Sequence, residues 1–188
     1  TDILPTSLEA TAVAIADRCE TLSGIFAIGE TPSGSKDPLA LRRASFAVLR
    51  LIIENGLALT LEQVFQAALK QLPFDAPEDT LKNLISYINE RYYARYEAHG
   101  IPVTTIRAVI NQGINEPLDF QSRLNALVEF SKLPESPVLA SAYKRVSNIL
   151  AKAKTFEARY LNERLIEDAE KGLATAIETL TPKLNAAL

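Results

Sequence analysis

The sequence is poor in the residues from which most catalytic and metal-binding sites are built. Its 188 residues include one histidine, His99, and one cysteine, Cys19, with no methionine or tryptophan. A zinc site made of histidine and cysteine needs roughly three or four such ligands, so these two residues cannot assemble one. A Ser-His-Asp arrangement would depend on His99, which we interpret instead as a packed or helix-capping residue. No catalytic and no metal-ligating residue is therefore predicted.

The scarcity of cysteine and the lack of long apolar runs also indicate the cellular compartment. A single cysteine cannot form an internal disulfide, so a reducing, cytoplasmic compartment is expected. No run approaches the roughly 18 to 20 apolar residues of a transmembrane helix, and no membrane partner is expected. Because methionine is missing even at position 1, we expect a fragment of a longer protein. The net charge of −3 argues against a basic DNA-binding protein, so any contact with a polyanion must be local.

The sequence does contain signals for the starts and ends of helices. Thr6–Glu9 and Thr60–Gln63 have capping-box spacing, and Asp37-Pro38 has the pattern of an N-cap followed by a first helical residue. The only strand-like stretch, residues 101–105, is short and contains Pro102. We predict an all-α fold of about eight helices, over residues 6–24, 37–56, 60–72, 77–100, 104–111, 117–132, 137–154 and 156–180.

Two other features suggest chemistry and are set aside. The loop GETPSGSK, residues 29–36, resembles a phosphate-binding loop in composition, but its glycines and lysine are wrongly spaced and no strand pattern precedes it. Asp17 lies among apolar residues beside Arg18, and we interpret the two as a salt bridge on a helix surface.

The first basic cluster belongs to the helix expected at residues 37–56. Arg42, Arg43 and Arg50 fall within about 100° of one another, opposite an apolar stripe that includes Val48. Lys36 precedes them in the loop. Guanidinium groups pair with phosphates, so these residues are candidates for RNA contact. A helix–helix contact with a charged rim is the alternative.

The second basic cluster, YKRVSNILAKAK at residues 143–154, carries four cations and no acid. Lys144, Arg145 and Lys152 are its candidate RNA-binding residues, and a solvated helix face is the alternative interpretation. A third segment, ERYYARY at residues 90–96, interleaves arginines with tyrosines. We expect most of it to be core.

Several segments resemble one family in the same order along the chain. ADRCETLSGIF (16–26) followed by GETPSGSKDPLALRRA (29–44), then ERYYARYEAHG (90–100), FQSRLNAL (120–127) and KRVSNILAK (144–152), resemble the β subunit of the bacterial heterotetrameric glycyl-tRNA synthetase. The resemblance implies the end of an HD-like helical domain at residues 1–56, a helical connecting region at 57–133, and a helical lead-in to an anticodon-binding domain at 134–188.

The resemblance also implies partners. In that family the separate α subunit activates glycine with ATP and Mg²⁺, while the β subunit chiefly recognises tRNA. We therefore expect this fragment to contact glycine tRNA and the α subunit, and to hold no cofactor of its own. A structural adaptor that orients the anticodon-binding domain without touching RNA is the alternative. A degenerate HD-type phosphohydrolase is a remote alternative, since only Asp17 resembles a remnant metal ligand and no histidine precedes residue 99.

Overall fold

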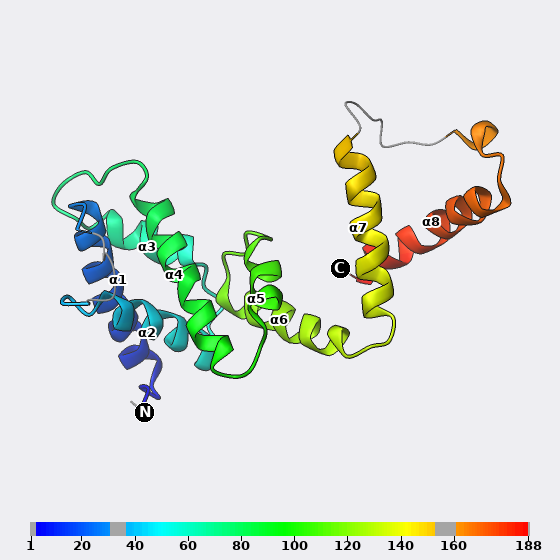
Figure 1. Ribbon diagram of the computed structural model, residues 1–188. Coiled ribbons are helices and arrows are strands. Elements are labelled where there is room, and N and C mark those ends of the chain that lie inside the picture. The colour runs from blue at the N-terminus through cyan, green and yellow to red at the C-terminus, as the bar shows by residue number, and fades with distance from the viewer. Residues whose placement is uncertain (1–2, 31–36, 153–160, 188) are drawn as a thin grey trace. The chain divides into compact units, whose positions relative to one another are not determined.

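A computed structural model describes residues 3–30, 37–152 and 161–187 of the chain (Figure 1). Within these ranges the chain forms eight α-helices and one 3₁₀ helix, and no strand. The all-α prediction is therefore confirmed. The chain divides into two compact units, Thr1–Ser136 and Pro137–Leu188, called here the N-terminal and C-terminal units. The predicted domain boundaries at residues 56 and 133 stay predictions.

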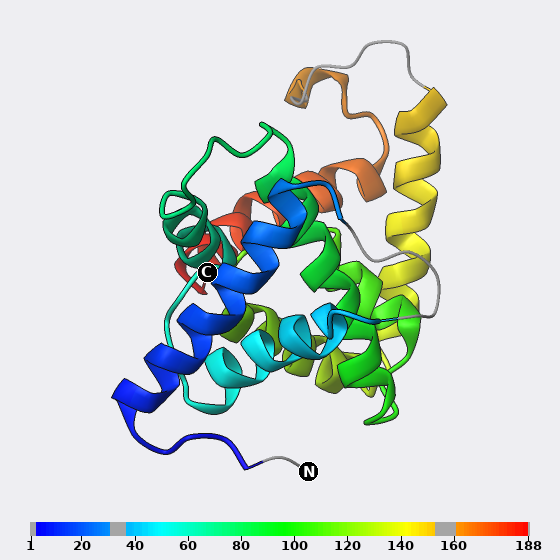
Figure 2. The same cartoon turned by 90° about the vertical axis from the view of Figure 1, so that its left-hand side faces the viewer.

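The described residues of the N-terminal unit form six helices. They are α1 (Leu8–Ala27), α2 (Leu41–Glu54), α3 (Leu61–Leu69), α4 (Thr80–Glu97), α5 (Val103–Ile110) and α6 (Pro117–Ser131). Helix α2 packs against α1, α4 and α6, and α1 also contacts α3 and α4. Figure 2 shows α1 in dark blue and α2 in cyan beside each other, with α4 in green next to both. The two helices that carry most of this unit's arginines, α2 and α4, are therefore neighbours.

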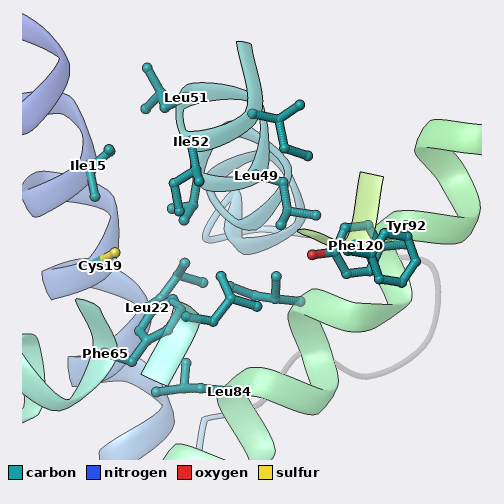
Figure 3. Close-up of a cluster of buried hydrophobic side chains, with 14 of the residues drawn as sticks. Ile15, Cys19, Leu22, Leu49, Leu51, Ile52, Phe65, Leu84, Tyr92 and Phe120 are labelled. Atoms are coloured by element: carbon teal, nitrogen blue, oxygen red, sulfur yellow. The ribbon is translucent and has the colours of Figure 1, made fainter. Parts of the chain in front are cut away.

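One continuous apolar core lies between these helices. Leu22 of α1, Ile52 of α2, Phe65 of α3 and Leu84 of α4 are completely buried, and Figure 3 shows them converging from their separate helices. At one side the ring of Phe120 from α6 stacks on that of Tyr92 from α4, with 3.7 Å between ring centroids and 6° between planes. Burial of such side chains removes apolar area from water, the main favourable contribution to folding.

The capping signals were partly correct. At α3 the Thr60 hydroxyl accepts a hydrogen bond from the Gln63 amide (3.1 Å), and the Gln63 side chain accepts one from the Thr60 amide (3.2 Å), so the predicted capping box is confirmed. Gly56, just beyond α2, has a φ of +64°, a left-handed conformation that favours glycine at a helix end. At α1 the N-cap is Ser7, whose hydroxyl accepts from the Ala10 amide, rather than Thr6.

The predicted start of α2 at Asp37-Pro38 is wrong by several residues. The Ala40 amide donates to the Asp37 carbonyl (3.1 Å) in a turn, and Ala40 itself adopts a φ of 56°, outside the helical region. The helix therefore begins at Leu41. Asp37 still acts on its first turn, because one carboxylate oxygen accepts from the Arg42 amide at 3.2 Å. The signal identified the capping group but not the intervening turn.

The C-terminal unit holds α7 (Ser136–Lys152) apart from its first residue, a 3₁₀ helix (Asn162–Arg164) and α8 (Asp168–Ala187). The helix predicted over 156–180 is corrected: its first residues lie outside the described ranges, and residues 165–167 precede α8 without helical structure. The Glu170 carboxylate accepts from the amides of Ile166 and Glu167 (2.9 and 3.0 Å), which places the start of α8 after them. None of the helices described in either unit has the length and hydropathy needed to cross a membrane.

Candidate nucleic-acid contact surface

A carboxylate joins two arginines across α2 and α4. Glu54 accepts from Arg50 Nε at 2.9 Å and Arg50 Nη2 at 3.2 Å, and also from Arg95 Nη1 at 3.1 Å. The hydrogen bonds from Arg50, and then those from Arg95, hold the pKa of Glu54 below its usual value. Two guanidinium groups share one carboxylate, so this network retains a net positive charge.

A second cationic site lies at Tyr87 on α4. The guanidinium of Arg91 lies 4.6 Å from the centre of the Tyr87 ring and 2.8 Å from a Glu90 carboxylate oxygen. Burial raises the pKa of Tyr87, while the charges of Arg91 and Arg42 act to lower it. The charges of Asp37 and Glu90 act to raise it, so carboxylates as well as arginines from the beginning of α2 and the middle of α4 act on this ring.

The three predicted arginines of α2 occupy different environments. Arg43 is exposed, and Arg42 is half-buried. Arg50 is held in the Glu54 network with 20% of its side chain exposed. The buried face of α2 is wider than the predicted stripe, since it also includes Leu49 and Ile53. Arg42 therefore lies at the edge of the packed face rather than opposite it.

Two arginines of this surface were not among the predicted site residues. The side chains of Arg91 and Arg95 are 13% and 14% exposed, and their guanidinium groups lie over the rings of Tyr87 and Tyr96. Their segment was noticed in the sequence but expected to be mostly core. Tyr92 and Tyr96 are indeed buried. Arg95, which lies between them, donates to Glu54 of α2. We call Arg42, Arg43, Arg50, Arg91 and Arg95 the arginine surface.

The second predicted cluster lies on α7, in the C-terminal unit. Lys144, Arg145 and Lys152 are all exposed and share one side of the helix. The other side carries exposed apolar side chains, including Val146 and Ile149. The solvated-face interpretation of these cations fits their exposure as well as an RNA contact does. Lys36, the remaining predicted residue, lies outside the described ranges.

The residues set aside in the sequence have structural roles. An N–H at His99 Nδ1 can donate to the Arg95 carbonyl 2.7 Å away, so the helix-capping interpretation is confirmed, while packing is not because His99 is exposed. Asp17 pairs with Arg18 at 3.6 Å on the surface of α1. Among the described residues no group of three or more histidine, cysteine or acidic side chains is placed to hold a metal ion.

The geometry defines an all-helical protein whose adjacent helices present a cluster of arginines, a surface compatible with a nucleic-acid backbone. A family model for the glycyl-tRNA synthetase beta subunit matches residues 1–111. The chain is 45% identical over 184 residues to the glycine–tRNA ligase beta subunit of Acinetobacter baylyi, covering 96% of this chain and 27% of that relative. It is 43% identical over 185 residues to the corresponding subunit of Edwardsiella ictaluri, with 97% and 27% covered.

This chain belongs to the glycyl-tRNA synthetase β-subunit family. The resemblance inferred from the ordered motifs is thereby confirmed. The chain spans 27% of the length of the curated relatives it matches.

Proposed function

We propose that this chain is a tRNA-contacting and scaffolding part of a glycine–tRNA ligase β subunit. The observation that carries the proposal is the arginine surface: α2, with three arginines, packs against α4, with two, and Arg50 and Arg95 share one carboxylate, in a chain of net charge −3. Among the described residues, the acidic side chains given in contact with α2 or α4 arginines are Asp37, Glu54 and Glu90, fewer than the five arginines. Phosphate contacts of this kind position an RNA without reading its sequence.

Within the whole enzyme, glycine activation with ATP and Mg²⁺ is assigned to the separate α subunit. This chain is given no catalytic residue and no cofactor. Residues 1–56 would form the C-terminal part of an HD-like domain, and residues 134–188 would lead into the anticodon-binding domain. Glycine tRNA and the α subunit are the expected partners, and the cytoplasm is the expected compartment.

A purely structural adaptor is the second candidate, and one observation favours it. Arg50 and Arg95 are bound to the same Glu54, so part of the arginine surface already joins α2 to α4. An arginine that holds two helices together contributes to the fold whether or not RNA is present. The two candidates differ in salt dependence, since only binding through phosphates weakens steeply as salt rises.

The test is a tRNA titration of the full-length β subunit carrying R42E together with R43E. The matched control is R123E, which reverses an exposed arginine on α6. We expect the double variant to bind tRNA about tenfold or more weakly than the parent at about 50 mM salt. The slope of log K against log salt concentration should become smaller in magnitude by about two. R123E should match the parent in both. A parallel variant with K144E and R145E compares the second cluster.

Glycine tRNA and an unrelated tRNA are titrated side by side, at about 50 mM and about 200 mM salt. Equal weakening for both would indicate electrostatic docking with identity read elsewhere. If R42E with R43E changes neither tRNA affinity nor binding of the α subunit, the arginine surface is not a contact surface and the adaptor stands.

A further inference from the structure

An open apolar groove of about 810 Å³ runs between α1 and α3, over the segment that joins α2 to α3. Leu8, Ala12 and Ala16 line it from successive turns of α1, and Ala67 and Ala68 line it from α3. Leu8 is 68% exposed, and Ala12, Ala16 and Ala67 are also exposed. The N-terminal unit therefore leaves an apolar trough uncovered beside its packed core.

The shape of the groove suits a helix. Its two walls are helices, and the side chains along them are mostly small, so the backbone of a third helix can approach closely. Residues at i, i+4 and i+8 on α1 form one wall, and Val64, Ala67 and Ala68, at i, i+3 and i+4 on α3, form the other. An amphipathic helix laid along such a groove is a common recognition arrangement.

The chemistry of the groove disfavours other occupants. Among the described residues that line it, Glu20 and Gln71 are the only ones with polar side chains, apart from the Cys19 thiol. The single formal charge is negative, so an RNA backbone would be repelled rather than held. Small-molecule sites usually combine an apolar wall with several convergent polar groups that orient the ligand, and this groove has too few.

We infer that the groove seats a helix from the part of the β subunit that lies outside these 188 residues. The curated relatives have only 27% of their length in common with this chain, so most of the polypeptide of such a subunit lies elsewhere. A covalently tethered segment competes at a high effective concentration, about millimolar for a short flexible connection, which favours it over a separate subunit. This inference rests on family membership and does not depend on tRNA binding by the arginine surface.

The experiment measures thiol labelling of the full-length β subunit with a maleimide, resolved by peptide mass spectrometry. Ala67→Cys places a reporter in the groove, and Val13→Cys is the matched control, because Val13 is 69% exposed on α1 and does not line the groove. The native Cys19 is 2% exposed, and burial raises the pKa of its thiol to about 12, so it labels slowly and gives little background.

In the isolated full-length β subunit we expect Cys at position 67 to label about tenfold or more slowly than Cys at position 13, because a seated helix excludes the reagent. In the 188-residue chain the two positions should label at similar rates. Similar rates in the full-length subunit would overturn the inference. Protection that appears only after the α subunit or tRNA is added would also overturn it, by assigning the groove to that partner.

Discussion

The two units of this chain use similar amphipathic helices with opposite results. In the N-terminal unit, apolar side chains from α1, α2, α3, α4, α5 and α6 form one buried cluster. In the C-terminal unit, α7 buries no residue, and in the part of α8 that the structure describes only Ala174 is buried. Yet α7 has an apolar side, with Val138, Val146 and Ile149 all more than half exposed.

The difference shows what an amphipathic pattern specifies. It determines that a segment is helical and which side is apolar, but not whether a partner covers that side. The N-terminal unit contains enough neighbouring helices to enclose α2. The C-terminal unit has two α-helices among its described residues, and their apolar sides remain accessible to water.

The largest expected effect tests the contrast in burial directly. Phe120→Ala removes a ring that is 1% exposed and stacked on Tyr92, and we expect it to lower the free energy of unfolding by about 3 to 5 kcal/mol. Tyr143→Ala on α7 removes a ring that is 74% exposed, and we expect a change within about 0.5 kcal/mol. Urea unfolding followed by circular dichroism measures both. Equal losses would mean that α7 is packed as tightly as the core.

A smaller effect is expected when threonine is replaced by alanine, and the same substitution is compared at two positions. Thr60→Ala removes the hydroxyl of the capping box at α3, and we expect a loss of about 1 kcal/mol. Thr175→Ala lies within α8, where the hydroxyl donates to the Lys171 carbonyl, and we expect no loss because alanine has the higher helix propensity. The same unfolding measurement distinguishes them, and a loss at Thr175 as large as at Thr60 would contradict this account.

The smallest expected effect concerns pH. Arginine hydrogen bonds lower the pKa of Glu54 in the folded protein, so its contribution to stability is present above the ordinary value of 4.5 and disappears as the pH falls through the lower folded value. With 35% of the Glu54 side chain exposed, solvent screening limits this contribution to below about 1 kcal/mol.

Glu54→Gln should therefore lower stability at neutral pH and flatten its dependence on pH below 4.5. Urea unfolding at a series of pH values gives the comparison, and added salt should shrink the difference between Gln and Glu. A variant whose pH profile matches that of the parent protein would show that Glu54 titrates alike in the folded and unfolded states.

Local sequence signals predicted most of the fold. The capping box at Thr60 and the glycine that ends α2, Gly56, act within a few residues, so both could be recognised without tertiary structure. The start of α2 was not, because the left-handed Ala40 follows no strong sequence rule. The start of α8 was misplaced for a related reason: Glu170 caps the helix from inside its first turn, and apolar periodicity alone extended the helix too far back.

The candidate site was predicted only in part. Periodicity along α2 placed Arg42, Arg43 and Arg50 near one another, as a regular helix requires. It could not show that Arg95, which is 41 residues from Glu54 in the sequence, reaches the same carboxylate. Whether Lys36, Arg42, Arg43, Arg50, Lys144, Arg145 and Lys152 touch RNA stays a prediction.

By itself, the sequence determined the helical class, most helix positions and, through its ordered motifs, the family. These properties depend on hydrogen bonds and side-chain periodicity within a few residues, or on the order of residues alone. Only the tertiary structure decided that α2 and α4 share a carboxylate, and that α1 and α3 leave a groove. Such pairings depend on how packing positions segments far apart in the chain, which no local pattern encodes.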